Sequence, residues 1–106
     1  MEIKQYSVCW INLDPVIGSE VNKTRPCVII SPDEMNKYLR TVIIAPLTHT
    51  LKHYPSRVPC IIDGDSGMIM LDQVKTVDKI RLGKYIAKLK KNEIEKLKEV
   101  INEIFC

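Results

Sequence analysis

The sequence lacks any apolar run near the roughly 18 residues that a membrane-spanning helix needs. The five residues at its start alternate charged and polar groups, so the apolar segment of a secretory signal is missing too. Apolar residues make up 45% and charged residues 27% of the 106 residues, a balance that argues against a disordered tail or a fibre. We therefore expect one soluble domain, residues 1–106, that stays in the cytoplasm and off membranes.

Familiar catalytic and nucleotide-binding motifs are absent as well. The sequence contains no P-loop, no G-x-G-x-x-G fingerprint, no G-x-S-x-G elbow and no H-E-x-x-H zinc motif. Its four cysteines form no C-x-x-C pair, and none has a histidine at zinc-binding spacing. We predict reduced thiols that behave as small apolar side chains, no metal site and no cofactor. These cysteines are Cys9, Cys27, Cys60 and Cys106.

Aromatic residues are few, with one Trp, four Tyr and one Phe. That number is too small for the broad stacking platform that binds single strands without sequence preference. The net charge is +3, and residues 81–106 carry 7 basic and 4 acidic groups. Because glutamates alternate with lysines there, a solvated helix face explains the excess better than a nucleic-acid patch does.

Short β-branched and alternating runs predict that most of the chain is β-structure. Two helices interrupt this pattern. For the first, over residues 32–39, Ser31 is the expected N-cap, with Glu34 completing a capping box. The expected strands cover residues 6–13, 27–30, 41–47, 57–62, 68–77 with a break near Asp72, and 85–89, with a tight connection over 63–67.

The second helix is expected at the C-terminal end, with Asn92 as its N-cap and Glu95 as the partner in a capping box. Its apolar residues recur at helical spacing and should form a stripe that packs on the sheet. This order of elements predicts a small, strongly bent barrel or half-barrel and not a parallel doubly wound sheet. The stripe consists of Ile94, Leu97, Ile101 and Ile104.

Residues 18–26 form the most informative segment of the chain. Pro26 favours an extended Arg25, which places this side chain at the start of a strand. If residues 27–31 pair antiparallel with residues 42–46 so that 29 faces 44, Arg25 also faces Thr48 on one rim of the sheet.

A structural role is open for both residues. Arg25 could tie its own loop to Asp14 or Glu20, and the Thr48 hydroxyl could satisfy backbone groups; spacing alone favours this alternative. The two histidines, His49 and His53, lie in a polar stretch where an exposed imidazole is the ordinary reading.

Several motifs together give this sequence a family resemblance. They are V-C-W-I-N-L-D-P at 8–15, G-S-E at 18–20, T-R-P at 24–26, A-P-L-T at 45–48, Y-P at 54–55 and L-D-Q-V-K-T-V-D at 71–78. In this order, over nearly the whole chain, they resemble the MazF/PemK family of toxin endoribonucleases. One departure is K-Q-Y-S at 4–7, where the family usually has an R-G-D/E opening.

The resemblance implies an SH3-like barrel of the MazF/CcdB type, a homodimer, and metal-independent cleavage of single-stranded RNA at a short sequence. In this family the 2′-hydroxyl attacks its own phosphate and leaves a 2′,3′-cyclic phosphate and a 5′-hydroxyl. Arg25 and Thr48 match the catalytic positions. A forked guanidinium and a hydroxyl can bind the charge that develops on the phosphate oxygens, whereas a guanidinium with a pKa above roughly 12 is a poor base. The identity of the general base is left open. His49 is the titratable neighbour of Thr48 in the sequence, and it is expected on the opposite face of the sheet if the strand continues.

RNA recognition would fall to polar side chains around this rim, because single strands are read on their splayed bases. Loop caps and solvated charges are the plain alternative for each of them. The resemblance also implies a groove between two subunits, blocked by a MazE-like antitoxin whose disordered tail competes with RNA. Acceptors and donors for bases are Glu20, Asp72 and Gln73, phosphate contacts are Lys23, Thr24 and Lys52, and His49 is a further RNA-binding residue.

Two other functions compete with the nuclease. The related CcdB-type toxins share the barrel but poison DNA gyrase through surface contacts, a role that needs neither Arg25 nor Thr48. A non-catalytic RNA-binding module would keep the groove without turnover.

Overall fold

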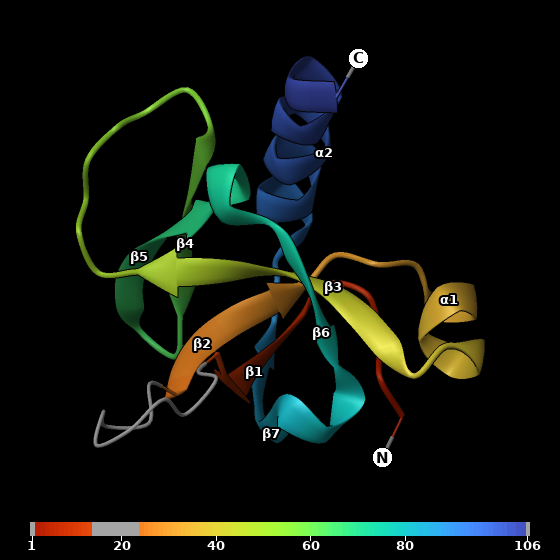
Figure 1. Ribbon diagram of the computed structural model, residues 1–106. Helices are drawn as coiled ribbons and strands as arrows, with labels where there is room; N and C mark the ends of the chain where they lie inside the picture. Colours follow the sequence, from red (N-terminus) through yellow and green to blue (C-terminus); the bar gives the residue numbers. More distant parts are fainter. Residues whose placement is uncertain (1, 14–23, 106) are drawn as a thin grey trace, which may run out of the picture.

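A single curled antiparallel sheet dominates the computed structural model, which describes residues 2–13 and 24–105 (Figure 1). The order of its strands is β4-β5-β3-β2-β1-β7, and β6 pairs with the first half of β3. The predicted bent half-barrel with an inserted and a C-terminal helix is confirmed. The elements are β1 (Ser7–Asn12), β2 (Thr24–Ile29), α1 (Asp33–Tyr38), β3 (Thr41–Thr48), β4 (Arg57–Ile62), β5 (Asp65–Met70), β6 (Lys75–Asp78), β7 (Leu82–Lys88) and α2 (Lys91–Phe105), with short 3₁₀ turns η1 (Leu71–Gln73) and η2 (Lys79–Arg81).

The two faces of the sheet bury two separate apolar clusters, because successive side chains of a strand point to opposite sides. On β2, for example, Val28 belongs to one cluster and its neighbours Cys27 and Ile29 to the other. We call the face that packs against α2 the inner face. It buries Val8, Val28, Ala45, Leu47, Val58, Cys60, Ile62, Ile69, Leu71, Leu89, Leu97 and Val100.

The opposite side of the sheet is the outer face. Its cluster lies toward the α1 end of β3, away from β4 and β5 (Figure 1). It buries Cys9, Ile11, Cys27, Ile29, Val42, Ile44 and Val77.

The stripe predicted for α2 packs largely as expected. Leu97 is buried, and Ile94 and Ile101 are partly buried against the same cluster. Ile104 remains 41% exposed, because the last turn extends past the sheet, while Val100 is buried in its place. No helix in the described part of the chain is both long and apolar enough to cross a membrane.

Both predicted capping boxes are wrong. Ser31 does not cap α1, because the N-cap of this helix is Pro32. The Ser31 hydroxyl instead donates to Asn36 Oδ1 and accepts from the Ile43 backbone N–H at 3.1 Å. Tertiary contacts with β3 therefore replace the local cap.

Glu93 caps α2 in place of the predicted pair. Because α2 begins at Lys91, Asn92 lies inside the helix and is not its N-cap, so the predicted capping box of Asn92 and Glu95 is wrong. Glu93 Oε1 accepts from the Lys90 N–H and Oε2 from the Ile61 N–H, each at 2.8 Å. One buried carboxylate thus caps the helix and ties it to β4.

The connection between β4 and β5 is a two-residue turn. Asp63 and Gly64 both have positive φ, 51° and 82°, as a tight hairpin turn of the primed type requires. As a consequence β5 begins at Asp65 and not at residue 68 as expected. The predicted break near Asp72 is confirmed as η1, after which β6 returns to pair with β3. β7 also begins earlier than predicted, at Leu82.

Candidate active site

The predicted register between β2 and β3 is confirmed. Cys27 faces Pro46, Val28 faces Ala45 and Ile29 faces Ile44. Arg25 and Thr48 lie two residues beyond the Cys27 and Pro46 pair on their strands. Because Cys27 and Ile44 belong to the outer cluster, alternation places Arg25 and Thr48 on that same face.

Both residues line a cleft of about 540 Å³ at the end of the sheet where β2 starts and β3 ends. That volume is typical of ligand sites. The cleft combines apolar side chains of the inner face with a polar rim from the ends of the strands and the β4–β5 turn. Its lining consists of Trp10, Thr24, Arg25, Pro26, Leu47, Thr48, His49, Thr50, Ile62, Asp63, Asp65, Ser66, Gly67 and Ile86.

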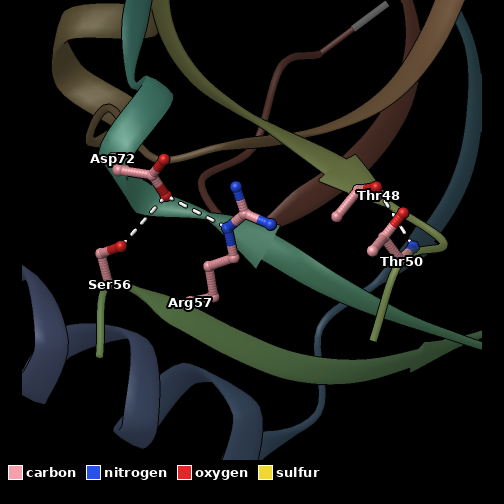
Figure 2. A network of polar contacts seen from close by, with 5 residues as sticks. All are labelled: Thr48, Thr50, Ser56, Arg57 and Asp72. Carbon is pink, nitrogen blue, oxygen red and sulfur yellow. Dashed lines mark hydrogen bonds and ion pairs between the residues drawn. The ribbon is translucent and has the colours of Figure 1, made fainter. Parts of the chain in front are cut away.

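Thr48 is the last residue of β3, and its side chain closes a small local turn. The Oγ1 atom accepts a hydrogen bond from the Thr50 N–H at 3.2 Å (Figure 2). The hydroxyl oxygen therefore satisfies a backbone group, as the structural alternative expected, but this hydrogen bond uses only one of its lone pairs. The hydroxyl proton remains available for an acceptor in the cleft.

His49 follows directly after the end of the strand. Its expected position on the face opposite Thr48 depended on the strand continuing, which it does not. With the chain turning at Thr48, alternation no longer applies, and His49 lines the same cleft.

Arg25 is half-buried, and its guanidinium has no hydrogen-bond or ion-pair partner among residues 2–13 and 24–105. The anchors considered for it, Asp14 and Glu20, lie outside the described residues. Its charge acts on Cys27. Burial raises the pKa of the Cys27 thiol to about 12, although the positive charges of Arg25 and Lys75 lower it.

The cleft gathers only part of the predicted RNA-binding set. Thr24 and His49 line it, whereas Lys52, Asp72 and Gln73 are exposed residues outside its lining. Glu20 and Lys23 fall outside the described residues. A role for each of them in RNA binding stays a prediction.

Asp72 belongs instead to a polar network around Arg57 (Figure 2). Asp72 Oδ1 accepts from Ser56 Oγ at 3.1 Å and from Arg57 Nε at 3.5 Å. The Tyr54 ring lies 4.8 Å from the Arg57 guanidinium carbon. Arg57 is thereby held from two sides.

Sequence reasoning missed the contribution of the β4–β5 hairpin to the cleft. Asp65 and Ser66 reach the rim because the two-residue turn brings β5 alongside the end of β3, where Thr48 faces Met68. The approach is close: a Cβ on Gly67 would lie 3.1 Å from the Thr48 carbonyl oxygen. The Asp-Gly turn signal could have placed these residues, had it been combined with the strand order.

Metal-ligating side chains do not cluster in the part of the chain that the structure describes. There, no group of three or more His, Cys, Asp or Glu side chains is placed to hold a metal ion. Cys9, Cys27 and Cys60 are buried free thiols.

Comparisons with known proteins agree on one family. A family model described as a PemK-like, MazF-like toxin of type II toxin-antitoxin systems matches residues 4–105. The Endoribonuclease EndoA of Bacillus subtilis (strain 168) is 29% identical over 109 residues, covering 95% of this chain and 92% of that protein.

Solved structures share the fold at low sequence identity. MazF (Form-I) from Deinococcus radiodurans superimposes with a TM-score of 0.81 at 22% identity, covering 98% of this chain and 96% of that one. The MazE-MazF structure (Form-III) from the same organism gives 0.83 at 20% identity, with coverages of 98% and 96%. The Mycobacterium tuberculosis toxin MazF-mt6 gives 0.79 at 24% identity, with coverages of 93% and 95%.

Proposed function

This chain belongs to the PemK-like, MazF-like toxin family of type II toxin–antitoxin systems, and from that premise we propose that it is a sequence-specific endoribonuclease that cleaves single-stranded RNA. The observation that carries the proposal is the position of Arg25 and Thr48 on neighbouring strands at one cleft. The similarity to Endoribonuclease EndoA supports the same activity.

In the proposed reaction the RNA 2′-oxygen forms a bond to phosphorus and the bond from phosphorus to the 5′-oxygen breaks. The 2′-hydroxyl proton passes to a base, and the departing 5′-oxygen takes up a proton. The products are a 2′,3′-cyclic phosphate and a 5′-hydroxyl. Negative charge grows on the two non-bridging oxygens during this step, so stabilising those oxygens lowers the barrier.

Arg25 supplies the main stabilisation in this scheme. Its guanidinium has no competing partner among the described residues, so its fork can bind both non-bridging oxygens. Because a guanidinium stays protonated at neutral pH, Arg25 can donate to the leaving oxygen but cannot act as the base. Thr48 donates its free hydroxyl proton alongside. These donors need no metal ion, and we expect cleavage to persist in excess chelator.

The base is to be sought among the titratable side chains of the cleft, which are His49, Asp63 and Asp65. RNA binding is assigned to the rim. Thr24 and His49 would contact the strand within the cleft. The further contacts predicted from the sequence are Glu20, Lys23, Lys52, Asp72 and Gln73.

We also propose a homodimer and an antitoxin partner. The MazE-MazF structures of Deinococcus radiodurans and a mycobacterial endoribonuclease in complex with its cognate antitoxin support the second. An acidic or amphipathic disordered segment would inhibit by occupying the cleft in place of RNA. Light scattering on the purified toxin, alone and with its antitoxin, tests both assemblies.

The test of the proposed function is an incubation of the purified protein with a long natural single-stranded RNA in excess chelator. We expect discrete fragments whose 5′ ends accept label from polynucleotide kinase without prior phosphatase treatment, because those ends carry a hydroxyl. Bound but intact RNA would indicate a non-catalytic RNA-binding module. Intact RNA in this incubation, together with stalled complexes in a separate assay with purified DNA gyrase, would indicate a gyrase poison. Either result contradicts the proposal.

A further inference from the structure

Arg57 presents a second guanidinium near Thr48, although it lies outside the lining of the cleft. Its side chain is only 15% exposed and its Nε atom is bound to Asp72, but its two terminal amino groups have no partner among the described residues. These groups are not sealed from solvent, because no buried side-chain nitrogen or oxygen in the described part of the chain is left unpaired. Both terminal amino groups therefore keep some contact with solvent.

Strand register places Arg57 on the same face of the sheet as Thr48. Val58 and Cys60 belong to the inner cluster, so Arg57 and Pro59 project from the outer face. On that face, Met68 of β5 pairs with both Thr48 and Pro59.

Arg57 lies two residues along β4 from Pro59 and two strands away from β3. With ordinary strand spacing of about 4.8 Å and a rise of about 3.3 Å per residue, its Cα lies about 12 Å from that of Thr48. Arg25 is on β2, the strand on the other side of β3, so the two arginines flank Thr48. In Figure 2 the Arg57 guanidinium lies between Asp72 and Thr48 in this view.

The contacts of Arg57 fix its position without using up its donors. Asp72 holds the Nε atom, Ser56 holds Asp72, and the Tyr54 ring packs on the guanidinium. A guanidinium fixed in this way loses little side-chain entropy when it binds an anion, and its remaining N–H groups match two oxygens of one phosphate. The ion pair with Asp72 uses only the Nε atom, so it leaves the terminal amino groups of Arg57 for another ligand.

We propose that Arg57 is a second phosphate-binding residue, which holds a neighbouring phosphate of the same RNA strand on the side of Thr48 away from Arg25. The ligand class is the phosphodiester of extended single-stranded RNA. Asp72 acts as a positioning residue for Arg57. This inference rests on the proposed nuclease function and adds to it a fixed direction for the strand across β3, β5 and β4.

The test compares Arg57→Gln with the wild type in binding and in cleavage. The site of cleavage is first mapped with the wild type, and an oligonucleotide covering it is made with a 2′-deoxy nucleotide at the attacking position. We expect Arg57→Gln to weaken binding of this probe about tenfold and to make the log–log salt slope shallower by about 0.7, the value of one phosphate contact in single strands. In cleavage, KM should rise about tenfold while kcat changes much less.

Two further variants separate binding from structure. Arg57→Lys keeps the charge but loses the fork, so the salt slope should stay at the wild-type value while affinity falls by less than in Arg57→Gln. Lys91→Gln removes an exposed charge at the start of α2 and should leave both slope and affinity unchanged. Thermal melting of each variant detects a merely structural role.

The outcomes distinguish this inference from the proposed function. If the wild type cleaves RNA but Arg57→Gln keeps the wild-type slope and KM, Arg57 is a structural tie and the inference is wrong while the nuclease stands. A salt slope that falls equally in Lys91→Gln also overturns it. If the wild type cleaves no RNA, both proposals fail together.

Discussion

The two faces of the sheet use the same strands for different purposes. On the inner face, Val58 and Ile69 are fully buried in the cluster that also contains Leu97 of α2. On the outer face, Arg57 directly precedes Val58, and Thr48 pairs with Met68, the neighbour of Ile69. Arg25 projects from the same face, two residues from the buried Cys27. At the cleft end of the sheet, strand alternation thus places residues of the inner core and residues proposed to bind RNA on opposite faces, one residue apart along the chain.

This comparison implies that substitutions on the two faces have opposite signatures. Changes on the outer face near the cleft should alter cleavage and leave stability unchanged, and changes on the inner face away from the cleft should do the reverse.

Arg25→Ala should have the largest effect. Loss of the guanidinium removes the main stabilisation of charge on phosphorus, and we expect cleavage to slow about 10³-fold, or ~4 kcal/mol in the activation barrier. The melting temperature should stay near that of the wild type, because the guanidinium has no partner among the described residues. Single-turnover cleavage and thermal melting measure the two quantities. The matched control is Arg40→Ala, an exposed arginine just after α1. Unfolding of Arg25→Ala would instead identify this side chain as a structural anchor.

Leu97→Ala tests the inner face. Leu97 is fully buried between α2 and the sheet, and truncation should lower the free energy of unfolding by about 3 kcal/mol through lost burial and the cavity left behind. The cleavage rate of the protein that remains folded should equal that of the wild type. Urea denaturation gives the stability, with the exposed Glu95→Ala as the control. A strong loss of cleavage in fully folded Leu97→Ala would contradict the separation of the faces.

Glu93→Gln tests the tie between α2 and β4. Both carboxylate oxygens accept backbone N–H groups, and an amide would point its NH₂ group at one of these donors. We expect the free energy of unfolding to fall by about 2 kcal/mol. Glu95→Gln in the same helix changes the same charge in solvent and should have no measurable effect. Equal stabilities of the two variants would show that Glu93 is not the cap of α2.

Cys27→Ala should have the smallest effect, a change in how the free energy of unfolding depends on pH. Burial raises the pKa of the folded Cys27 thiol to about 12, from an ordinary value of 9. Above pH 9 the unfolded chain therefore releases this proton while the folded protein keeps it, and stability falls as the pH rises. The wild type should lose about 1 kcal/mol more than Cys27→Ala between pH 9 and pH 10. Denaturation at both pH values measures the difference; identical losses would mean that Cys27 ionises freely in the folded state.

Local pattern and register were enough to predict the central part of the site. Pro26 and the β-branched runs predicted β2 and β3, and a symmetric pairing of these strands predicted that Arg25 lies opposite Thr48, in the register that the structure shows. The amphipathic stripe likewise identified α2 and its buried residue Leu97.

What escaped prediction depends on contacts between segments far apart in the sequence. Arg57 belongs on the Thr48 face only because β5 lies between β3 and β4, an order that no single strand specifies. The local pattern near the start of α2 favoured Asn92 and Glu95 as its cap, whereas a hydrogen bond from the Ile61 N–H of β4 holds Glu93 in that role. Ser31 is drawn from its expected cap by Asn36 and β3 in the same way.

The central claim is that Arg25 and Thr48 act together on one phosphate. The most direct measurement is a double-mutant cycle of single-turnover cleavage rates for Arg25→Ala, Thr48→Ala and the combined variant. Because the two side chains would stabilise the same transition state, we predict that each single variant is slow and that the double variant loses less than about tenfold beyond Arg25→Ala. A wild-type rate in either single variant, or a double-variant loss equal to the product of the two single losses, would contradict the claim.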